Sequence, residues 1–184
     1  KKDNIIPGGR IHNFKDFMEF PSSVFTALPK RPKAFVHKQL LQPVRIMDVL
    51  DKEDILLHFP YHSFDSIIDL LREAAIDPFV KNIKITCYRL ASESKVINTL
   101  VNAVRNGKAV TVMLELRARF DEEANLRWKS VLEEEGVKVI LGIPNMKVHA
   151  KLCVIKRREG NTTKQYGFVS TGNLNESTAR FYGD

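Results

Sequence analysis

The sequence is poor in cysteine and has no long apolar run. Its two cysteines, Cys87 and Cys153, both fall within predicted strands of a 184-residue chain, which excludes a disulfide framework and favours a reducing cytoplasm. No apolar run is long enough to cross a bilayer, and no signal-peptide pattern is present. We therefore expect a cytoplasmic protein without a transmembrane segment, and peripheral association at a membrane stays open.

Two common signatures of ligand-binding proteins are also missing. The sequence has no glycine-rich loop with a lysine of the Walker type and no cluster of cysteine and histidine at metal-ligand spacing. It contains no internal repeat and no low-complexity tract. These absences exclude a P-loop nucleotide site, a zinc-finger-like site and a repeat architecture.

Positive charge, in contrast, is abundant. Lysine and arginine number 29 against 22 acidic residues, which gives a net charge of +7. Such a balance favours an anionic partner: nucleic acid, phospholipid or another phosphate compound. The 43% hydrophobic content supports a real core in one domain with an appendage. Because the chain starts at Lys1 and stops at Asp184, we expect a piece of a longer protein.

From residue 54 onward, strand-like and helix-like patterns alternate. Apolar residues at helical spacing predict helices, and short β-rich runs between them predict strands. The expected strands are 54–59, 82–88, 109–116, 137–141, 149–157 and 164–170, and the expected helices are 63–75, 94–107, 121–136 and a short one near 171–180. This order predicts an α/β fold with βαβ units and a final hairpin.

The stretch "KVHAKLCVI", residues 147–155, places His149 and Lys151 two positions apart in a predicted strand. Side chains of a strand alternate between faces, so these two should lie on the same face. An ammonium beside an imidazole lowers the pKa of the imidazole, which leaves a neutral nitrogen able to attack a phosphoryl group. The alternative is a core or hairpin histidine with satisfied hydrogen bonds.

Two arginines follow consecutive predicted strands. Arg89 comes after "NIKITCY", and Arg119 comes after "AVTVMLEL". Ligands bind beyond the carboxyl ends of strands in such sheets, and two guanidiniums there would form a clamp for phosphate oxygens. The alternative is that both are surface arginines at the starts of loops.

The turn "STGNLN", residues 170–175, is a further candidate anion site. Backbone N–H groups at a strand-to-helix turn can cradle an anion, although a short turn of this composition is more often only a loop. The acids of "DEEAN" could hold magnesium, but the first turn of a helix explains them without a metal.

The spacing of these residues resembles the phospholipase D superfamily motif, H-x-K-x4-D-x6-G-S-x-N. Here it reads His149-x-Lys151, followed by Ser170, Thr171, Gly172 and Asn173. The acid of the motif would fall at Lys156 and is absent, and the spacing to the turn is longer. This departure argues against a typical phosphodiesterase of that superfamily.

A closer resemblance, to the polyphosphate kinase family that works through a phosphohistidine, covers nearly the whole chain. It is carried by "GGRIHNFKDF", "FPYHSFDSIIDLLREAAIDP", "IKITCYRLA", "ELRARFDEEANLRW", "VHAKL" and "STGNLNESTARFY". The resemblance implies an α/β phospholipase D-like domain with a mixed, mostly parallel sheet flanked by helices. Residues 1–45 would be a lead-in from a preceding head domain, and 46–184 the first of two phospholipase D-like domains.

The resemblance also implies roles for particular residues. His149 matches the histidine that accepts the γ-phosphoryl group of ATP, and Tyr182 matches a nucleotide-contacting position. Arg89 and Arg119 match the Mg–phosphate pair; an arginine has no lone pair for Mg²⁺, so we expect both to hold phosphate oxygens to which the metal also binds. Lys151 would be an electrostatic helper.

The expected function is therefore reversible phosphoryl transfer between ATP and inorganic polyphosphate, with Mg²⁺ as cofactor. The partners would be ATP or ADP and polyphosphate, without specific nucleic acid, and the full-length protein would be a homo-oligomer. The family builds its site between two halves, so this chain alone need not be active. Two alternatives stay open: a phospholipase D-type phosphodiesterase or nuclease, and a non-enzymatic basic module that binds polyanions.

Overall fold

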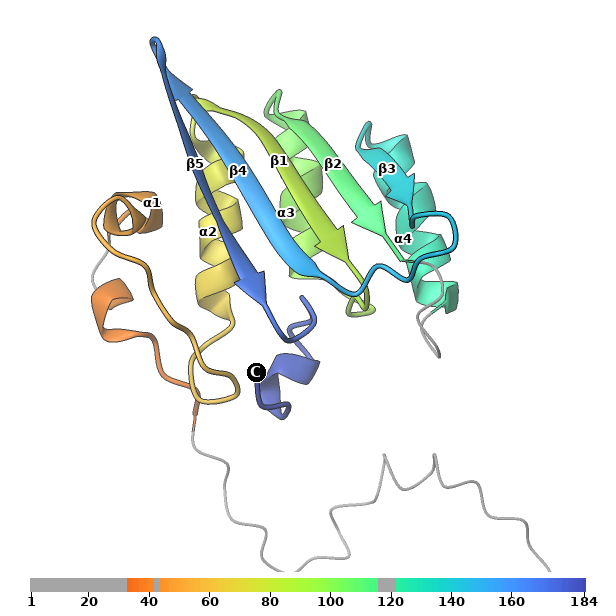
Figure 1. Ribbon diagram of the computed structural model, residues 1–184, viewed down its shortest axis with the longest axis horizontal. Coiled ribbons are helices and arrows are strands. Elements are labelled where there is room, and N and C mark those ends of the chain that lie inside the picture. Colours follow the sequence, from red (N-terminus) through yellow and green to blue (C-terminus); the bar gives the residue numbers. More distant parts are fainter. Residues whose placement is uncertain (1–32, 42–43, 116–121) are drawn as a thin grey trace, which may run out of the picture. The chain divides into compact units, whose positions relative to one another are not determined.

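A five-stranded sheet forms the centre of the molecule (Figure 1). The computed structural model describes residues 33–41, 44–115 and 122–184. The strand order is β3-β2-β1-β4-β5. The strands are β1 (Val80–Cys87), β2 (Ala109–Leu114), β3 (Lys138–Leu141), β4 (Lys151–Glu159) and β5 (Thr162–Ser170).

The sheet is mixed, as predicted. β1 pairs in parallel with β2, and β2 pairs in parallel with β3. β4 runs antiparallel to both β1 and β5, so four of the five strands point in one direction. The predicted hairpin between β4 and β5 is present, and Gly160 occupies its turn with a φ of 58°, which glycine adopts without steric cost.

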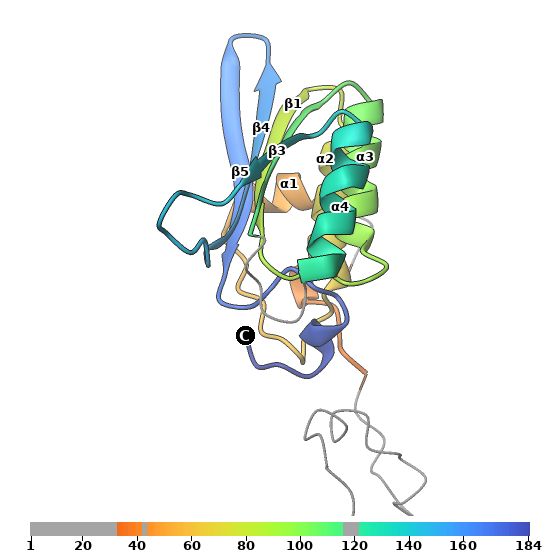
Figure 2. The same ribbon diagram turned by 90° about the vertical axis from the view of Figure 1, so that its right-hand side faces the viewer.

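Three helices cover a single face of this sheet (Figure 2). The sequence starts and stops α3 (Lys95–Arg105) with recognisable signals: Ser94 accepts a hydrogen bond from the N–H of Ile97 at its start, and Gly107 follows its end with a φ of 78°. The helices are α2 (Asp65–Ile76), α3 (Lys95–Arg105) and α4 (Glu122–Glu134).

The core lies between these helices and the sheet. Its largest side chains have no solvent-exposed surface, and burial of each contributes roughly 1.5–3 kcal/mol to folding. On the sheet side they include Ile83, Val112 and Ile155, and on the helix side Leu71, Leu100 and Leu132. The strands are thereby anchored along one face, and their ends form a rigid edge for functional groups.

Three sequence-based predictions of secondary structure were wrong. Residues 54–59, predicted as a strand, form no strand; their apolar side chains alternate in exposure, but their backbone joins no ladder. β4 begins at Lys151 rather than at 149, so His149 precedes the strand. The predicted short helix near 171–180 is a single 3₁₀ turn, η5 (Thr178–Arg180).

The remaining described elements are short. η4 (Lys38–Leu40) and α1 (Ile46–Leu50) precede the sheet in the chain, and Met47 of α1 is buried in the core. None of the helices in the described ranges is both long and apolar enough to span a membrane.

Candidate active site

The candidate site lies at the edge of the sheet where β1 and β2 end. Tyr88 and Arg89 follow β1, and Glu115 follows β2. β4 starts at this same edge because it runs antiparallel to β1, with Cys153 opposite Ile85. The segment just before β4, which carries His149, is therefore brought to the C-terminal ends of the parallel strands, where ligands bind in such sheets.

His149 and Lys151 are in contact. The Lys151 Nζ lies 3.0 Å from each ring nitrogen of His149 and donates a hydrogen bond of 2.7 Å to the His149 carbonyl oxygen. The lysine is only 3% exposed, whereas the imidazole is exposed to solvent. The two-residue spacing in extended backbone thus places a buried ammonium against an accessible imidazole.

The ring of Tyr88 is at the centre of a group of cations. It meets the His149 ring edge-on, at 4.8 Å between centroids. The Lys151 Nζ, the Lys147 Nζ and the Arg89 Cζ lie 5.2, 5.5 and 5.8 Å from the centroid of the Tyr88 ring. The quadrupole of the ring stabilises the cations held over it. These five residues are called the cationic site from here on.

The electrostatics of the cationic site favour a neutral imidazole. Burial and the positive charges of Lys151, Lys147 and Arg89 lower the pKa of His149 below its usual value. Burial also lowers the pKa of Lys151; Asp184 opposes this shift, and Arg89 adds to it. At neutral pH His149 therefore carries an available lone pair, and the surrounding charges favour an anionic ligand.

Asp184 is an acidic neighbour of the site that sequence reasoning did not identify. Its charge acts on Lys151, and its carboxylate packs against Gly172, where any Cβ would overlap it. Its backbone exchanges two hydrogen bonds with Phe59, at 2.9 and 3.1 Å. The only signal in the sequence was indirect: Gly172 belongs to the motif-like turn, and only a glycine there leaves room for this carboxylate.

The turn at 170–175 differs from the anion cradle considered above. The N–H of Gly172 donates to Ser170 Oγ at 3.1 Å. The N–H groups of Ser177 and Thr178 donate to Asn175 Oδ1 at 3.0 and 3.1 Å. One backbone donor of the turn and two donors that follow it are thus occupied by side chains of the turn, so these three N–H groups are not available to an anion.

The structure places the other three predicted site residues differently. Arg89 is part of the cationic site, whereas Arg119 lies outside the described residues. Half of the surface of Tyr182 is exposed, and its ring packs against Phe181 at 4.8 Å between centroids. Within the described ranges, no hydrogen bond or ring contact joins Tyr182 to His149 or Lys151.

Asn125 is a further residue that sequence reasoning missed. Its fully buried side-chain amide donates to the carbonyl oxygens of Tyr88 and Glu115, at 3.0 and 2.9 Å. Trp128, one turn later on α4, donates from Nε1 to the Ala91 carbonyl oxygen at 3.0 Å. Helix α4 thereby ties the ends of β1 and β2 together. The only signal was a polar residue on the inner side of a predicted helix.

The donor set of the site fits phosphate rather than a directly bound metal. The part of the chain that the structure describes contains no group of three or more His, Cys, Asp or Glu side chains arranged to hold a metal ion. The arginine and two lysines of the cationic site have no lone pair for Mg²⁺ at neutral pH, but they can contact phosphate oxygens. Any magnesium here would have to be held through a phosphate ligand.

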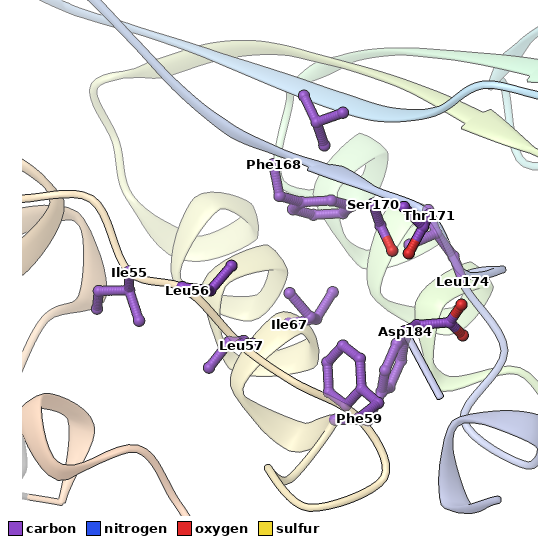
Figure 3. A pocket seen from close by; sticks show the side chains of 12 residues that line it. Ile55, Leu56, Leu57, Phe59, Ile67, Phe168, Ser170, Thr171, Leu174 and Asp184 are labelled. Atoms are coloured by element: carbon purple, nitrogen blue, oxygen red, sulfur yellow. The ribbon is translucent and has the colours of Figure 1, made fainter. Parts of the chain in front are cut away.

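A separate pocket of about 220 Å³ lies beside β5 (Figure 3). Its walls are mainly apolar and come from segment 55–59, α2 and β5, with Ser170, Thr171 and Asp184 at one side. It has no cationic lining, so it is a poor match for phosphate. Asp184 links this pocket to Lys151.

Fold and site together define the class: an α/β domain that presents a histidine–lysine pair, ringed by cations, at the edge of a mixed sheet. Residues 45–184 match the family model of the polyphosphate kinase C-terminal domain 1. Polyphosphate kinases from Vibrio cholerae and Escherichia coli K12 are 49% and 45% identical to this chain over 99% of its length. The chain belongs to the polyphosphate kinase family.

The solved structure of a polyphosphate kinase agrees with this assignment. The crystal structure of polyphosphate kinase from Porphyromonas gingivalis matches 99% of the chain with a TM-score of 0.76 and 36% identity. The phospholipase D family member Nuc from Salmonella typhimurium matches 60% of the chain, with a TM-score of 0.40 and 15% identity. The chain spans 26% and 27% of the length of the V. cholerae and E. coli relatives and 31% of the P. gingivalis chain.

Proposed function

We propose that this chain carries the phosphoryl-accepting site of a polyphosphate kinase, which transfers the γ-phosphoryl group of ATP reversibly to inorganic polyphosphate through a phosphohistidine at His149. The observation that carries the proposal is the contact between His149 and Lys151 within the cationic site. An accessible imidazole with a lowered pKa, surrounded by fixed positive charge, is suited to attack an anionic phosphorus centre.

In the first step a ring nitrogen of His149 attacks the γ-phosphorus of ATP in line with the leaving oxygen. The N–P bond forms, the P–O bond to ADP breaks, and its electron pair leaves on the ADP β-phosphate. Because the imidazole is neutral at the start, its lone pair makes the bond and no proton has to be removed first. The lowered pKa of His149 supports this state at neutral pH.

The cations act on charge that shifts during transfer. Lys151 is buried and in contact with the histidine, so its position is well defined while the phosphoryl oxygens approach. Arg89 and Lys147 also lie near Tyr88, with the Arg89 Cζ at 5.8 Å and the Lys147 Nζ at 5.5 Å from the ring centroid. In the proposal Arg119 completes a clamp with Arg89. Phosphoryl transfer needs mostly positioning and electrostatic stabilisation of this kind.

In the second step the terminal oxygen of a polyphosphate chain attacks the phosphorus of the phosphohistidine. The O–P bond forms, the N–P bond breaks, and the electron pair returns to the imidazole. Run in reverse with ADP as acceptor, the same steps produce ATP. The net charge of +7 suits a polyanionic substrate, whose binding we expect to weaken with added salt.

Magnesium enters the proposal with the nucleotide. Mg²⁺ would neutralise charge on the ATP phosphates, while Arg89 holds phosphate oxygens that the metal shares. Tyr182, with half of its surface exposed, is proposed to contact the nucleotide. Homo-oligomerisation of the full-length protein and a cytoplasmic or membrane-peripheral location are further expectations of the same proposal.

One observation favours a second candidate, a phospholipase D-type phosphodiesterase. The linear motif lacks its acid at Lys156, but another carboxylate, that of Asp184, acts electrostatically on Lys151. A hydrolysis assay with bis(4-nitrophenyl) phosphate distinguishes the two functions. Hydrolysis that depends on His149, without a stable adduct from ATP, would favour the phosphodiesterase.

The deciding experiment is intact-mass analysis of the full-length protein after incubation with Mg-ATP. We expect a single phosphate adduct that is labile in acid, stable in base and absent from His149→Ala. His58→Ala, which alters another exposed histidine, is the matched control and should retain the adduct. No adduct on the wild-type protein, or an adduct that persists in His149→Ala, would contradict the proposed function.

A further inference from the structure

The backbone around His149 is held by side chains instead of by the sheet. The ladder between β1 and β4 runs only as far as Ile85 and Cys153, and residues 147–150 belong to no strand. Beyond that point Thr86, the second-last residue of β1, donates a hydrogen bond from Oγ1 to the Ala150 carbonyl oxygen at 2.6 Å. Thr86 Oγ1 also accepts a hydrogen bond from the N–H of Leu152, at 3.0 Å.

A second side chain holds the other flank of the histidine. The carboxylate of Glu115 accepts a hydrogen bond of 2.9 Å from the N–H of Val148. Glu115 is only 3% exposed, and its own N–H donates to the Cys87 carbonyl oxygen at 3.0 Å, which joins it to the end of β1. The contact therefore links the residue before His149 to the rigid ends of two strands.

The two contacts enclose a single functional residue. Glu115 holds position 148, and Thr86 holds positions 150 and 152, so the backbone of His149 is fixed from both sides while its ring stays exposed. Neither Thr86 nor Glu115 hydrogen-bonds to the imidazole itself. A nucleophile must approach phosphorus along a narrow range of directions, and small misplacements of a reacting group cost rate steeply.

We propose that Thr86 and Glu115 are positioning residues that aim His149 at the phosphorus, and we call this pair the histidine brace. The inference rests on the proposed function, because the brace matters for rate only if His149 is the phosphoryl acceptor. The brace takes the place of ladder hydrogen bonds in the segment just before β4, where residues 147–150 belong to no strand. Its effect is therefore on the rate of phosphorylation and not on the binding of ATP.

The test uses the full-length protein and conservative pairs of variants. Thr86→Val keeps the shape of the side chain and removes the hydroxyl, whereas Thr86→Ser restores it. Glu115→Leu removes the acceptor, whereas Glu115→Gln keeps a carbonyl oxygen for the Val148 N–H. Thr111→Val, on the neighbouring strand β2 and outside the brace, is the matched control. Single-turnover phosphorylation by Mg-ATP, ATP affinity and amide hydrogen exchange of residues 147–152 are measured for each.

We expect Thr86→Val to phosphorylate roughly 10–100-fold more slowly, as misplacement of a reacting group predicts. ATP affinity should stay within about two-fold, and exchange should accelerate in the 147–152 peptide. Thr86→Ser should recover to within about three-fold of wild type, and Thr111→Val should match wild type. Glu115→Leu and Glu115→Gln should repeat this loss and rescue at the other flank.

Two results would overturn the inference. One is wild-type phosphorylation of His149 in both Thr86→Val and Glu115→Leu. The other is a loss that Ser and Gln fail to rescue while unfolding of the variants is unchanged. If Glu115→Leu does not fold, the variants Thr86→Val and Thr86→Ser alone test the inference. Both should fold, because Thr86 is half-buried and valine has its shape. A wild-type protein that forms no adduct at His149 refutes the proposed function instead, and hydrogen exchange still reports whether the brace holds the backbone.

Discussion

Strand β1 has a charged cluster at each end, and the two clusters are built differently. Just before the strand, buried Asp77 pairs with Arg45 and with Arg157. The Lys108 Nζ donates to the Asp77 carbonyl oxygen at 2.5 Å. Just after the strand lies the cationic site around Tyr88, where cations meet an aromatic ring and an imidazole. The first is called the Asp77 cluster below.

The pKa shifts in the two clusters run in opposite directions. Hydrogen bonds to Glu159 and Asp77 raise the pKa of Arg157, so its charged form is favoured. Burial lowers the pKa of Lys151, so its charged form is disfavoured despite the attraction of Asp184. A charge inside a protein is costly unless it is paired. Both arginines of the Asp77 cluster are paired with carboxylates and stabilise the fold, whereas the cationic site favours an anionic ligand.

The largest expected effect comes from replacing the buried lysine at each end of β1 by methionine. Lys151→Met should slow phosphorylation by roughly 100–1,000-fold, because it removes a fixed charge at the reacting group, and the unfolding free energy should not fall. Lys108→Met should leave the rate within about two-fold. It should lower the unfolding free energy by about 1–3 kcal/mol, since the Asp77 carbonyl loses its donor. Single-turnover kinetics and urea unfolding measure both quantities.

The contrast between the clusters breaks down if the two lysine variants behave alike. A Lys108 variant that loses phosphorylation as severely as the Lys151 variant would mean that both ends serve the reaction. A Lys151 variant that unfolds more easily, with an unchanged rate, would make Lys151 a structural residue.

The next effect is on stability, at the Asp77 cluster. Burial opposes ionisation of Asp77, but the Phe79 N–H, Arg157 and Arg45 outweigh it and lower the pKa. Its stabilisation is therefore present above the unfolded pKa of about 4 and is lost as pH falls through the folded value. Asp77→Asn should lower the unfolding free energy by roughly 1–3 kcal/mol at pH 7, less than a fully buried pair because Arg45 is half-exposed.

Urea unfolding at pH 7 and pH 3 measures this effect. The difference between Asp77→Asn and wild type should shrink at pH 3, and the rate of phosphorylation should be unchanged at neutral pH. An equal difference at both pH values would show that the charge of Asp77 contributes nothing.

The third effect is a shift in the pH profile at the cationic site. Burial, Lys151, Lys147 and Arg89 lower the pKa of His149, so the reactive neutral form persists below pH 6.5. The acid limb of single-turnover phosphorylation should therefore lie below pH 6.5 in the wild type. It should move upward in Lys151→Met, because a cation that disfavours protonation is removed. A limb that stays in place in the variant would assign it to another group.

The smallest effect is expected at the exposed rim of the site. Lys147→Ala should weaken polyphosphate binding by about two- to five-fold with little change in rate, because an exposed cation contributes only modestly. The difference should diminish as salt is raised. Lys129→Ala, which removes a lysine paired with Glu133 on α4, is the control and should bind as wild type does. Equal losses of polyphosphate affinity in both variants would show that only the net charge of the protein matters.

Local patterns predicted most of the fold. The apolar stripes of α2 and α3 and the short runs of β1, β2 and β3 were located correctly to within a few residues. The contact between His149 and Lys151 was predicted as well, because extended backbone brings residues two positions apart to one side. The failure at 54–59 has the same origin, since alternation in a sequence does not reveal whether a partner strand is available.

The sequence by itself determined the order of the elements and the pair of residues on which the proposed chemistry depends, because periodicity and two-residue spacing are properties of the local backbone. Only the tertiary structure decided what surrounds that pair. Tyr88 reaches it from the end of β1, Asp184 from a segment beyond β5, and the brace of Thr86 and Glu115 from the ends of β1 and β2. Such contacts form when distant segments pack on a common sheet edge.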